Sequence, residues 1–296
     1  MKYISREGSA IINISKYLLT THVGDRLVTI DQLSERYEIS VGFAQKALTT
    51  IEEAKGASFQ RQGRNGTCIQ SLDEQVLTKL AGISHLVCAM PLPYTKHYEG
   101  LASALKIQMN EVPFYFAHMR GAHTRAECLE AGTYDIAIMS KAAAKTHDKE
   151  LMIALELGQH SYTNEHKLIF RQGEYEKIRR VGVDSDSPDQ TLLTEQFFSD
   201  REIELVEIGY GDGINRLNNK QIDAVIWLPE AVEMSALGLE QRSLLDAPLS
   251  REASEAVLLV RKDSDYLRSL LTKVLDIDAL KSHQQQVING DIFPSY

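Results

Sequence analysis

From residue 85 onward, short apolar segments alternate with segments that have the periodicity of amphipathic helices. The apolar segments are typical of β-strands and lie at residues 85–91, 112–119, 134–140, 179–184, 203–210, 222–230 and 255–262. The helical segments lie at residues 97–108, 123–132, 187–198 and 214–221, and further helices follow at the C-terminal end. Strands connected by helices pair in the same direction, so this order predicts an α/β fold with parallel sheets.

This α/β part also contains an internal repeat. Residues 121–138 end in LEAGTYDIAI, and residues 209–226 end in LNNKQIDAVI. Identical residues recur at one common offset: Gly121/Gly209, Leu129/Leu217, Asp135/Asp223 and Ile138/Ile226. Each repeat consists of a helix, a turn, an aspartate and a buried strand, and the pair predicts two similar lobes.

Residues 1–70 have a different pattern, which predicts three helices followed by a hairpin. Residues 9–20 have helical spacing of apolar side chains. Thr29 and Ser40 each precede another helical segment, and each is expected to cap it. The GRNG sequence at residues 63–66 predicts the hairpin, because Asn-Gly is a strong signal for a tight turn between strands.

Three helices and a two-stranded wing make a winged helix-turn-helix, and these residues resemble the GntR-type DNA-binding domains. The resemblance is carried by Tyr37, Ile39-Ser40, Ala47-Leu48, Arg61, Gly63, Gly66-Thr67 and Ile69. It implies that residues 1–70 bind double-stranded DNA. The side chains expected to contact DNA are those of Thr29, Ser40, Gln45, Lys46, Arg61 and Arg64.

The third helical segment departs from the GntR pattern at two positions. Val41 and Gln45 stand where that family usually carries arginines, so base reading by this helix is expected to be weakened or altered. Arg61 and Arg64 are expected to contact phosphates or the minor groove from the wing. Two alternatives stay open: these arginines only solvate an exposed hairpin, or the Val41-Gly42-Phe43 segment serves contact with another protein.

Residues 71–82 predict a linker helix between the two parts. Gly56 is expected to stop the preceding helix. Ser71 and Glu74 have the spacing of a capping box, and apolar residues follow at helical spacing. The expected domains are therefore 1–70, the linker 71–82 and a ligand-sensing domain 83–296.

The two repeats, with a chain that returns to the first lobe near its end, resemble the type 2 periplasmic-binding-protein fold. Lobe I is expected at about residues 83–175 and 250–296, and lobe II at about residues 176–249. The same fold serves as the effector domain of LysR-type regulators. A winged helix joined to it is similar to the YhfZ-type family of bacterial regulators, and that resemblance implies a transcription regulator that responds to a ligand.

Ligands of open α/β sheets bind beyond the carboxyl ends of the strands, here in the cleft between the lobes. The residues predicted at these ends are Pro91, Tyr94, Arg120, Gly121, Ser140 and Lys141 in lobe I, and Ser185, Ser187, Tyr210, Trp227 and Glu230 in lobe II. Arg120 could hold a carboxylate or phosphate, or form a salt bridge. Ser185 and Ser187 could offer an anion site or only cap a helix, and Trp227 could form a cleft wall or pack in the core.

The sequence lacks the motifs of common enzyme classes, with no GxSxG, HExxH, Walker or GxGxxG pattern. His118, His123 and Cys128 do not have the spacing of a zinc site. We therefore expect no catalytic residues, no metal and no cofactor. The alternative is a small-molecule enzyme or plain solute-binding module on the same two-lobed fold, with the winged helix used for protein contacts.

The composition fits a cytoplasmic DNA-binding protein. The net charge of the 296-residue chain is −9, but residues 1–70 hold nine Lys and Arg against seven Asp and Glu, so the +2 of this part leaves −11 for the rest. The three cysteines form no CxxC pair, which is typical of reduced thiols. Neither a signal peptide nor an apolar segment of membrane-spanning length is present, so no membrane contact is expected. A homodimer is expected, because paired half-sites increase DNA specificity.

Overall fold

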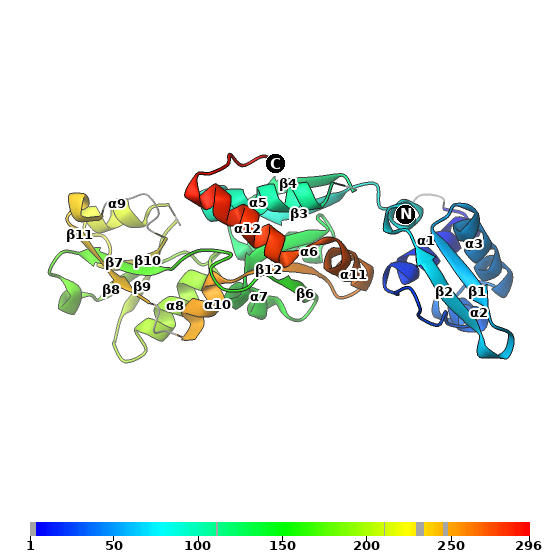
Figure 1. Ribbon diagram of the computed structural model, residues 1–296. Coiled ribbons are helices and arrows are strands. Elements are labelled where there is room, and N and C mark those ends of the chain that lie inside the picture. Colours follow the sequence, from blue (N-terminus) through cyan, green and yellow to red (C-terminus); the bar gives the residue numbers. More distant parts are fainter. Residues whose placement is uncertain (1–3, 111, 210, 229–233, 245–247) are drawn as a thin grey trace. The chain divides into compact units, whose positions relative to one another are not determined.

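Figure 1 shows a computed structural model of the chain, which describes all residues except 1–3, 111, 210, 229–233 and 245–247. The chain separates into two compact units. The first comprises Met1–Leu86, Met109–Tyr115 and Asp263–Val274, and the second comprises Val87–Gln108, Phe116–Lys262 and Leu275–Tyr296. The domain limits expected from the sequence stay predictions.

The first unit contains the expected three helices and wing. Its helices are α1 (Arg6–Leu19), α2 (Ile30–Arg36), α3 (Val41–Glu53), α4 (Glu74–Leu80) and α11 (Asp265–Val274), and its wing strands are β1 (Ala57–Arg61) and β2 (Thr67–Leu72). The 3-10 turn η1 (Gly63–Asn65) connects the two antiparallel strands. The fully buried side chains at its centre are Ile14, Leu18, Leu33, Ala47, Ile51 and Ile69.

Both predicted helix caps of the helix-turn-helix are confirmed. Thr29 and Gln32 form a capping box, in which the Thr29 hydroxyl accepts from the Gln32 amide at 3.2 Å and the Gln32 carboxamide accepts from the Thr29 amide at 2.9 Å. Ser40 caps α3 by accepting from the Phe43 amide at 3.2 Å. These caps fix where α2 and α3 begin, and thereby which side chains face outward.

The predicted stop of α3 at Gly56 is wrong in its detail. The helix ends at Glu53, and Lys55 rather than Gly56 adopts the left-handed conformation, with φ of 63°. Gly56 is needed for a different reason. A Cβ atom there would lie 3.3 Å from the side chains of Ile51 and Leu77, so the glycine allows close packing of α3 and α4.

The predicted capping box of the linker helix is also wrong. Ser71 belongs to strand β2, where its hydroxyl lies 2.6 Å from that of Ser58 on β1. Asp73 caps α4 instead, and its carboxylate accepts from the Val76 amide at 2.9 Å. The hairpin pairing continues through Leu72, so the helix can begin only after it.

The remaining strands form two five-stranded sheets with the orders β4-β3-β5-β12-β6 and β11-β7-β10-β8-β9. The strands are β3 (Leu86–Met90), β4 (Phe114–His118), β5 (Ile136–Ser140), β6 (Leu151–Glu156), β7 (Lys167–Arg171), β8 (Arg180–Val183), β9 (Glu204–Glu207), β10 (Ala224–Trp227), β11 (Leu239–Ser243) and β12 (Ala256–Arg261). The helices are α5 (Lys96–Gln108), α6 (Ala122–Glu130), α7 (Lys141–Ala144), α8 (Pro188–Phe197), α9 (Gly213–Asn218), α10 (Pro248–Ser254) and α12 (Ile277–Asn289). Helices α5 and α12 lie side by side against the first sheet (Figure 1).

The expectation of parallel sheets is wrong, because both sheets are mixed. Strands β3 and β5 pair in parallel, as do β8 with β9 and with β10. Strand β12 is antiparallel to β5 and β6, and β7 is antiparallel to β10 and β11. Strands β6, β7 and β11 were not predicted. Strand β11 has the sequence LEQRS, and this polar composition is like that of a loop. The polar side chains are compatible with a strand here because β11 lies at the edge of its sheet.

The internal repeat is confirmed at the level of hydrogen bonds. The Asp135 carboxylate, just before β5, accepts from the Val87 amide of β3 at 2.8 Å. The Asp223 carboxylate, just before β10, accepts from the amides of Arg179 and Arg180 at the start of β8, at 3.2 and 2.9 Å. In each lobe the repeated aspartate therefore fastens the neighbouring parallel strand at its N-terminal end.

Candidate functional site

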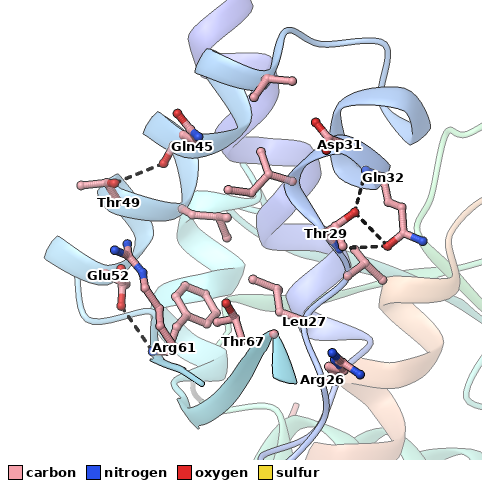
Figure 2. A pocket seen from close by; sticks show the side chains of 16 residues that line it. Arg26, Leu27, Thr29, Asp31, Gln32, Gln45, Thr49, Glu52, Arg61 and Thr67 are labelled. Atoms are coloured by element: carbon pink, nitrogen blue, oxygen red, sulfur yellow. Dashed lines mark hydrogen bonds between the residues drawn. The ribbon is translucent and has the colours of Figure 1, made fainter. Parts of the chain in front are cut away.

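A groove of about 1010 Å³ lies on the first unit between α2, α3 and the wing (Figure 2). The α3 face that lines it carries Val41, Gln45, Leu48, Thr49 and Glu52. The opposite walls come from residues 26–32 and from the wing residues Phe59, Arg61, Gly66 and Thr67.

Of the six predicted DNA-contacting residues, four lie in the groove or at the wing tip, and two lie elsewhere. Thr29, Gln45 and Arg61 line the groove, and Arg64 lies at the exposed wing tip. Ser40 acts as the cap of α3. Lys46 points away from the groove toward α1, where its ammonium lies 2.9 Å from the carboxylate of Glu7.

Arg26 is a groove residue that the sequence did not single out. It pairs as an isolated bridge with Cys68, and its guanidinium lies against Gly66, which follows the turn of the wing. Gly66 has φ of 83°, and a Cβ atom there would lie 2.7 Å from the Arg26 Nε. The left-handed backbone conformation favours glycine at this position, which is the physical reason for the Gly-Thr pair of the wing.

Carboxylates limit where an anion can lie in the groove. Asp31 at the start of α2 and Glu52 near the end of α3 both line it. One Glu52 oxygen accepts from the Phe59 amide at 3.3 Å and so fastens the wing strand to α3. Positive charge is therefore concentrated on the wing side, at Arg26, Arg61 and Arg64, where a phosphate backbone could be held.

The second site is a cavity of about 50 Å³ between the two lobes. Of the predicted ligand residues, Pro91, Tyr94, Arg120, Gly121 and Ser187 line it. Gly121 has φ of 82°, and a Cβ atom there would lie 3.1 Å from the Asp186 side chain of lobe II, so the glycine permits the lobes to approach. The cavity has room for one or two water molecules, which means that a metabolite requires the lobes to separate.

The other predicted ligand residues have structural contacts. Ser140 caps α7 and is fully buried, whereas Lys141 is paired with Glu156 at 2.6 Å. The Ser185 hydroxyl donates to Glu207 at 3.0 Å, and Trp227 packs against the core of lobe II. Tyr210 and Glu230 lie outside the described residues.

Four buried cavity residues were missed: Arg125, Tyr162, His166 and Asp189. Arg125 donates to the carbonyl oxygens of Ile138 and Met119 at 2.9 and 3.0 Å, and to the Tyr162 hydroxyl at 3.2 Å. In the sequence Arg125 looks like an ordinary solvated helix residue. A single signal was available for Asp189: it stands in the first turn of a helix that follows a strand end.

Asp189 and Ser140 join the two lobes. The buried Ser140 hydroxyl donates to the carboxylate of Asp189, which lines the cavity. Burial raises the pKa of Asp189 to about 6, against the opposing effects of the Ser140 hydrogen bond and the nearby Arg125 charge. Burial also lowers the pKa of His166 to about 4, so its ring is neutral at pH 7. Its Nδ1 atom is buried without a hydrogen-bond partner among the described residues.

Two family models match the chain. Residues 22–69 match a helix-turn-helix domain model, and residues 73–296 match the model of the YhfZ C-terminal domain. The chain belongs to the YhfZ family. The YhfZ protein of Escherichia coli (strain K12) is 45% identical over 297 residues, which cover 99% of each chain. The GntR-like character of the winged helix stays a prediction, because the matched model is that of a general helix-turn-helix.

Solved structures support the fold of the two-lobed part. The crystal structure of YhfZ from Shigella flexneri is 47% identical, with a TM-score of 0.69 over 75% of this chain and 97% of that one. The periplasmic aliphatic sulphonate binding protein SsuA from Escherichia coli is 15% identical, with a TM-score of 0.50 over 70% of this chain and 77% of that one. This second likeness shows a periplasmic-binding-protein-like fold for the YhfZ C-terminal domain. Among the described residues, the helices are too short or too polar to cross a bilayer.

Proposed function

We propose that the chain is a cytoplasmic transcription regulator that binds double-stranded DNA through the winged helix and senses a small anionic metabolite between its lobes. The observation that carries the DNA part is the groove between α2, α3 and the wing, which Arg26 and Arg61 line, with Arg64 at the exposed wing tip. Arg61 and Arg64 make no hydrogen bond or ion pair with the described residues. Unpaired guanidinium groups beside a recognition helix are suited to phosphate contact.

The ligand part rests on the inter-lobe cavity. Arg120 stands at its mouth and also has no ion pair within the described part of the chain. Ala122 at the start of α6 and Ser187, the N-cap of α8, line the same cavity, but their amides already donate to the carbonyl oxygens of Asp186 and Asp184 at 3.1 and 2.9 Å. Arg120 is therefore the group available to an anion. A carboxylate or phosphate is therefore the expected effector group.

Helix α11 offers a route by which ligand binding could reach the DNA-binding unit. The chain runs from strand β12 of the two-lobed part directly into α11, which packs against α1. Lys273 of α11 donates to the Thr21 carbonyl oxygen at 2.6 Å, and Lys16 of α1 lies 4.5 Å from the centre of the Tyr266 ring. We infer that a change at β12 would act on the first unit through this covalent connection to α11.

The DNA part is tested with the full chain and a random-sequence duplex, followed by fluorescence anisotropy at about 50 and 200 mM salt. We expect binding that weakens steeply with salt. Absence of binding at the lower salt concentration would reject DNA as the partner and favour protein contact by the winged helix. Sedimentation of the same sample tests the proposed homodimer.

The ligand part is tested by thermal unfolding with inorganic phosphate and with a panel of small mono- and dicarboxylates. Arg120→Ala should abolish any rise in Tm that a panel member gives. Arg251→Ala, an exposed arginine on α10, is the matched control and should keep the rise. Equal stabilisation of all three proteins would show that Arg120 does not hold the anion.

The competing proposal is an enzyme on the same fold. It is favoured by Asp189 and His166, whose shifted pKa values lie within one cavity. The stabilising compound is incubated with the full chain and recovered for mass spectrometry. Unchanged compound supports a sensor, and a converted compound supports the enzyme.

A further inference from the structure

The groove face of α3 carries no positively charged side chain along its whole described length, Val41–Glu53. Val41, Gln45 and Thr49 follow one another along this face, spaced about one turn apart. Lys46 is the sole cation of this helix, and it is paired with Glu7 outside the groove. Any base contact made from this face is therefore made by an uncharged side chain or by the Glu52 carboxylate, and not by a cation.

Uncharged side chains of these types discriminate among bases by known chemistry. Arginine and lysine read guanine, a carboxamide pairs with the N6 and N7 of adenine, and an apolar group contacts the methyl group of thymine. Val41 is 41% exposed although it is apolar, and it stands in the first turn of α3. The Gln45 carboxamide is exposed and has no hydrogen-bond partner among the described residues, so both its donor and its acceptor are available.

The other two groove residues of α3 are less available. The Thr49 hydroxyl donates to the Gln45 carbonyl oxygen at 3.1 Å within the helix. A glutamate can accept from the amino group of cytosine, but Glu52 already accepts from the Phe59 amide. Val41 and Gln45 are thus the pair placed to select bases.

We propose that α3 reads adenine–thymine pairs in the major groove, with Val41 against a thymine methyl group and Gln45 on the N6 and N7 of adenine. This proposal rests on the DNA-binding function proposed above. It assigns base selection to α3, and backbone attachment to the arginines of the wing side.

The first test is selection of binding sites from a random duplex library by the full chain. Wild-type protein should enrich A·T pairs within the half-site. Gln45→Arg should change one fixed position from A·T to G·C, with a discrimination of about 5- to 150-fold. Gln75→Arg is the matched control, because it adds the same charge on an exposed residue of α4 outside the groove. It should leave the selected sequence unchanged.

The second test removes the thymine methyl group. Replacing thymine by uracil in the selected site should weaken wild-type binding by about fourfold for each contacted methyl group. Val41→Ser should bind the thymine and uracil duplexes equally. This variant tests Val41 separately from Gln45. Its affinity for the thymine duplex is compared with its affinity for the uracil duplex, and not with the affinity of wild type.

The outcomes separate this proposal from the one on which it rests. Sites enriched in G·C at the position that Gln45→Arg alters, or binding with no base preference, would overturn the reading by α3 and leave DNA binding intact. Failure to bind any duplex would remove the DNA-binding function and this proposal with it. A·T enrichment with both variant effects supports the proposal.

Discussion

The polar side chains of the groove and those of the inter-lobe cavity differ in whether they already have hydrogen-bond partners. In the groove, the side chains of Arg61 and Gln45 are exposed and have no hydrogen-bond or ion-pair partner among the described residues. In the cavity, Arg125 has three acceptors, and Asp189 is held by Ser140. A partner can bind these groove side chains without breaking a hydrogen bond within the protein. A ligand in the cavity must replace hydrogen bonds that protein groups already make with one another. Binding at the cavity is therefore coupled to a change of conformation, and binding at the groove is not.

The largest expected effect is the loss of Arg125. Arg125→Met should lower the free energy of unfolding by about 3–5 kcal/mol, because it leaves buried acceptors and Asp189 without a positive partner. Arg61→Met, the same change in the groove, should alter stability by less than about 0.5 kcal/mol. Urea unfolding of both variants measures the difference. Equal values would contradict the contrast between the two sites.

The second expected effect is on the pH dependence of stability. The pKa of Asp189 is raised to about 6 from 3.8, so the folded state binds this proton more tightly than the unfolded chain does. The stability that this proton provides is complete below pH 3.8 and is lost as the pH rises through 6. Asp189→Asn removes this dependence, so its stability relative to wild type should increase between pH 4 and 7 by up to about 3 kcal/mol.

The stability of Asp189→Asn is compared with that of wild type because the titration of His166 changes stability with pH in the opposite direction. Its pKa is lowered from 6.5 to about 4, so its contribution is lost as the pH falls through this range. It is common to both proteins and cancels in the difference. Parallel stability curves for wild type and Asp189→Asn would show that Asp189 does not titrate differently in the folded state.

The third expected effect concerns the wing. Arg64→Ala should weaken binding to a random duplex and reduce the slope of log affinity against log salt by about one. Lys79→Ala on α4 removes the same charge from an exposed position outside the groove, and its slope should equal that of wild type. An unchanged slope in Arg64→Ala would mean that the wing arginine only solvates the hairpin.

The smallest expected effect comes from the exposed pair of Lys46 and Glu7. Glu7→Gln should release Lys46 toward DNA and strengthen binding by about two- to fivefold, with a change in stability below about 1 kcal/mol. Anisotropy titration at low salt measures the gain. If the affinity does not change, Lys46 is not a phosphate contact, and the groove side alone holds the DNA.

The sequence predicted the winged motif and the repeat because both depend on local signals. Thr29 and Ser40 cap helices through contacts three residues away, and Asp135 and Asp223 keep their place before a strand in both lobes. The cap at Ser71 was predicted wrongly. The local sequence allows a cap there, but Ser71 pairs with Ser58 of β1 and so belongs to strand β2. Strand direction was also predicted wrongly, because antiparallel pairing of β12 depends on how a distant segment returns.

By itself the sequence determined the three helices and the hairpin of the first unit and the caps at Thr29 and Ser40, since each depends on residues within one or two helical turns. Only the tertiary structure decided which side chains meet. Arg125 and Tyr162 are separated by 37 residues, and Ser140 and Asp189 by 49, yet each pair is joined by a hydrogen bond in the cavity. Helix periodicity marks a residue as inward or outward, but it carries no information about which distant polar group shares the interior with it. Long-range pairing of buried polar groups is set by the requirement that each be satisfied, and only the folded chain shows how that requirement is met.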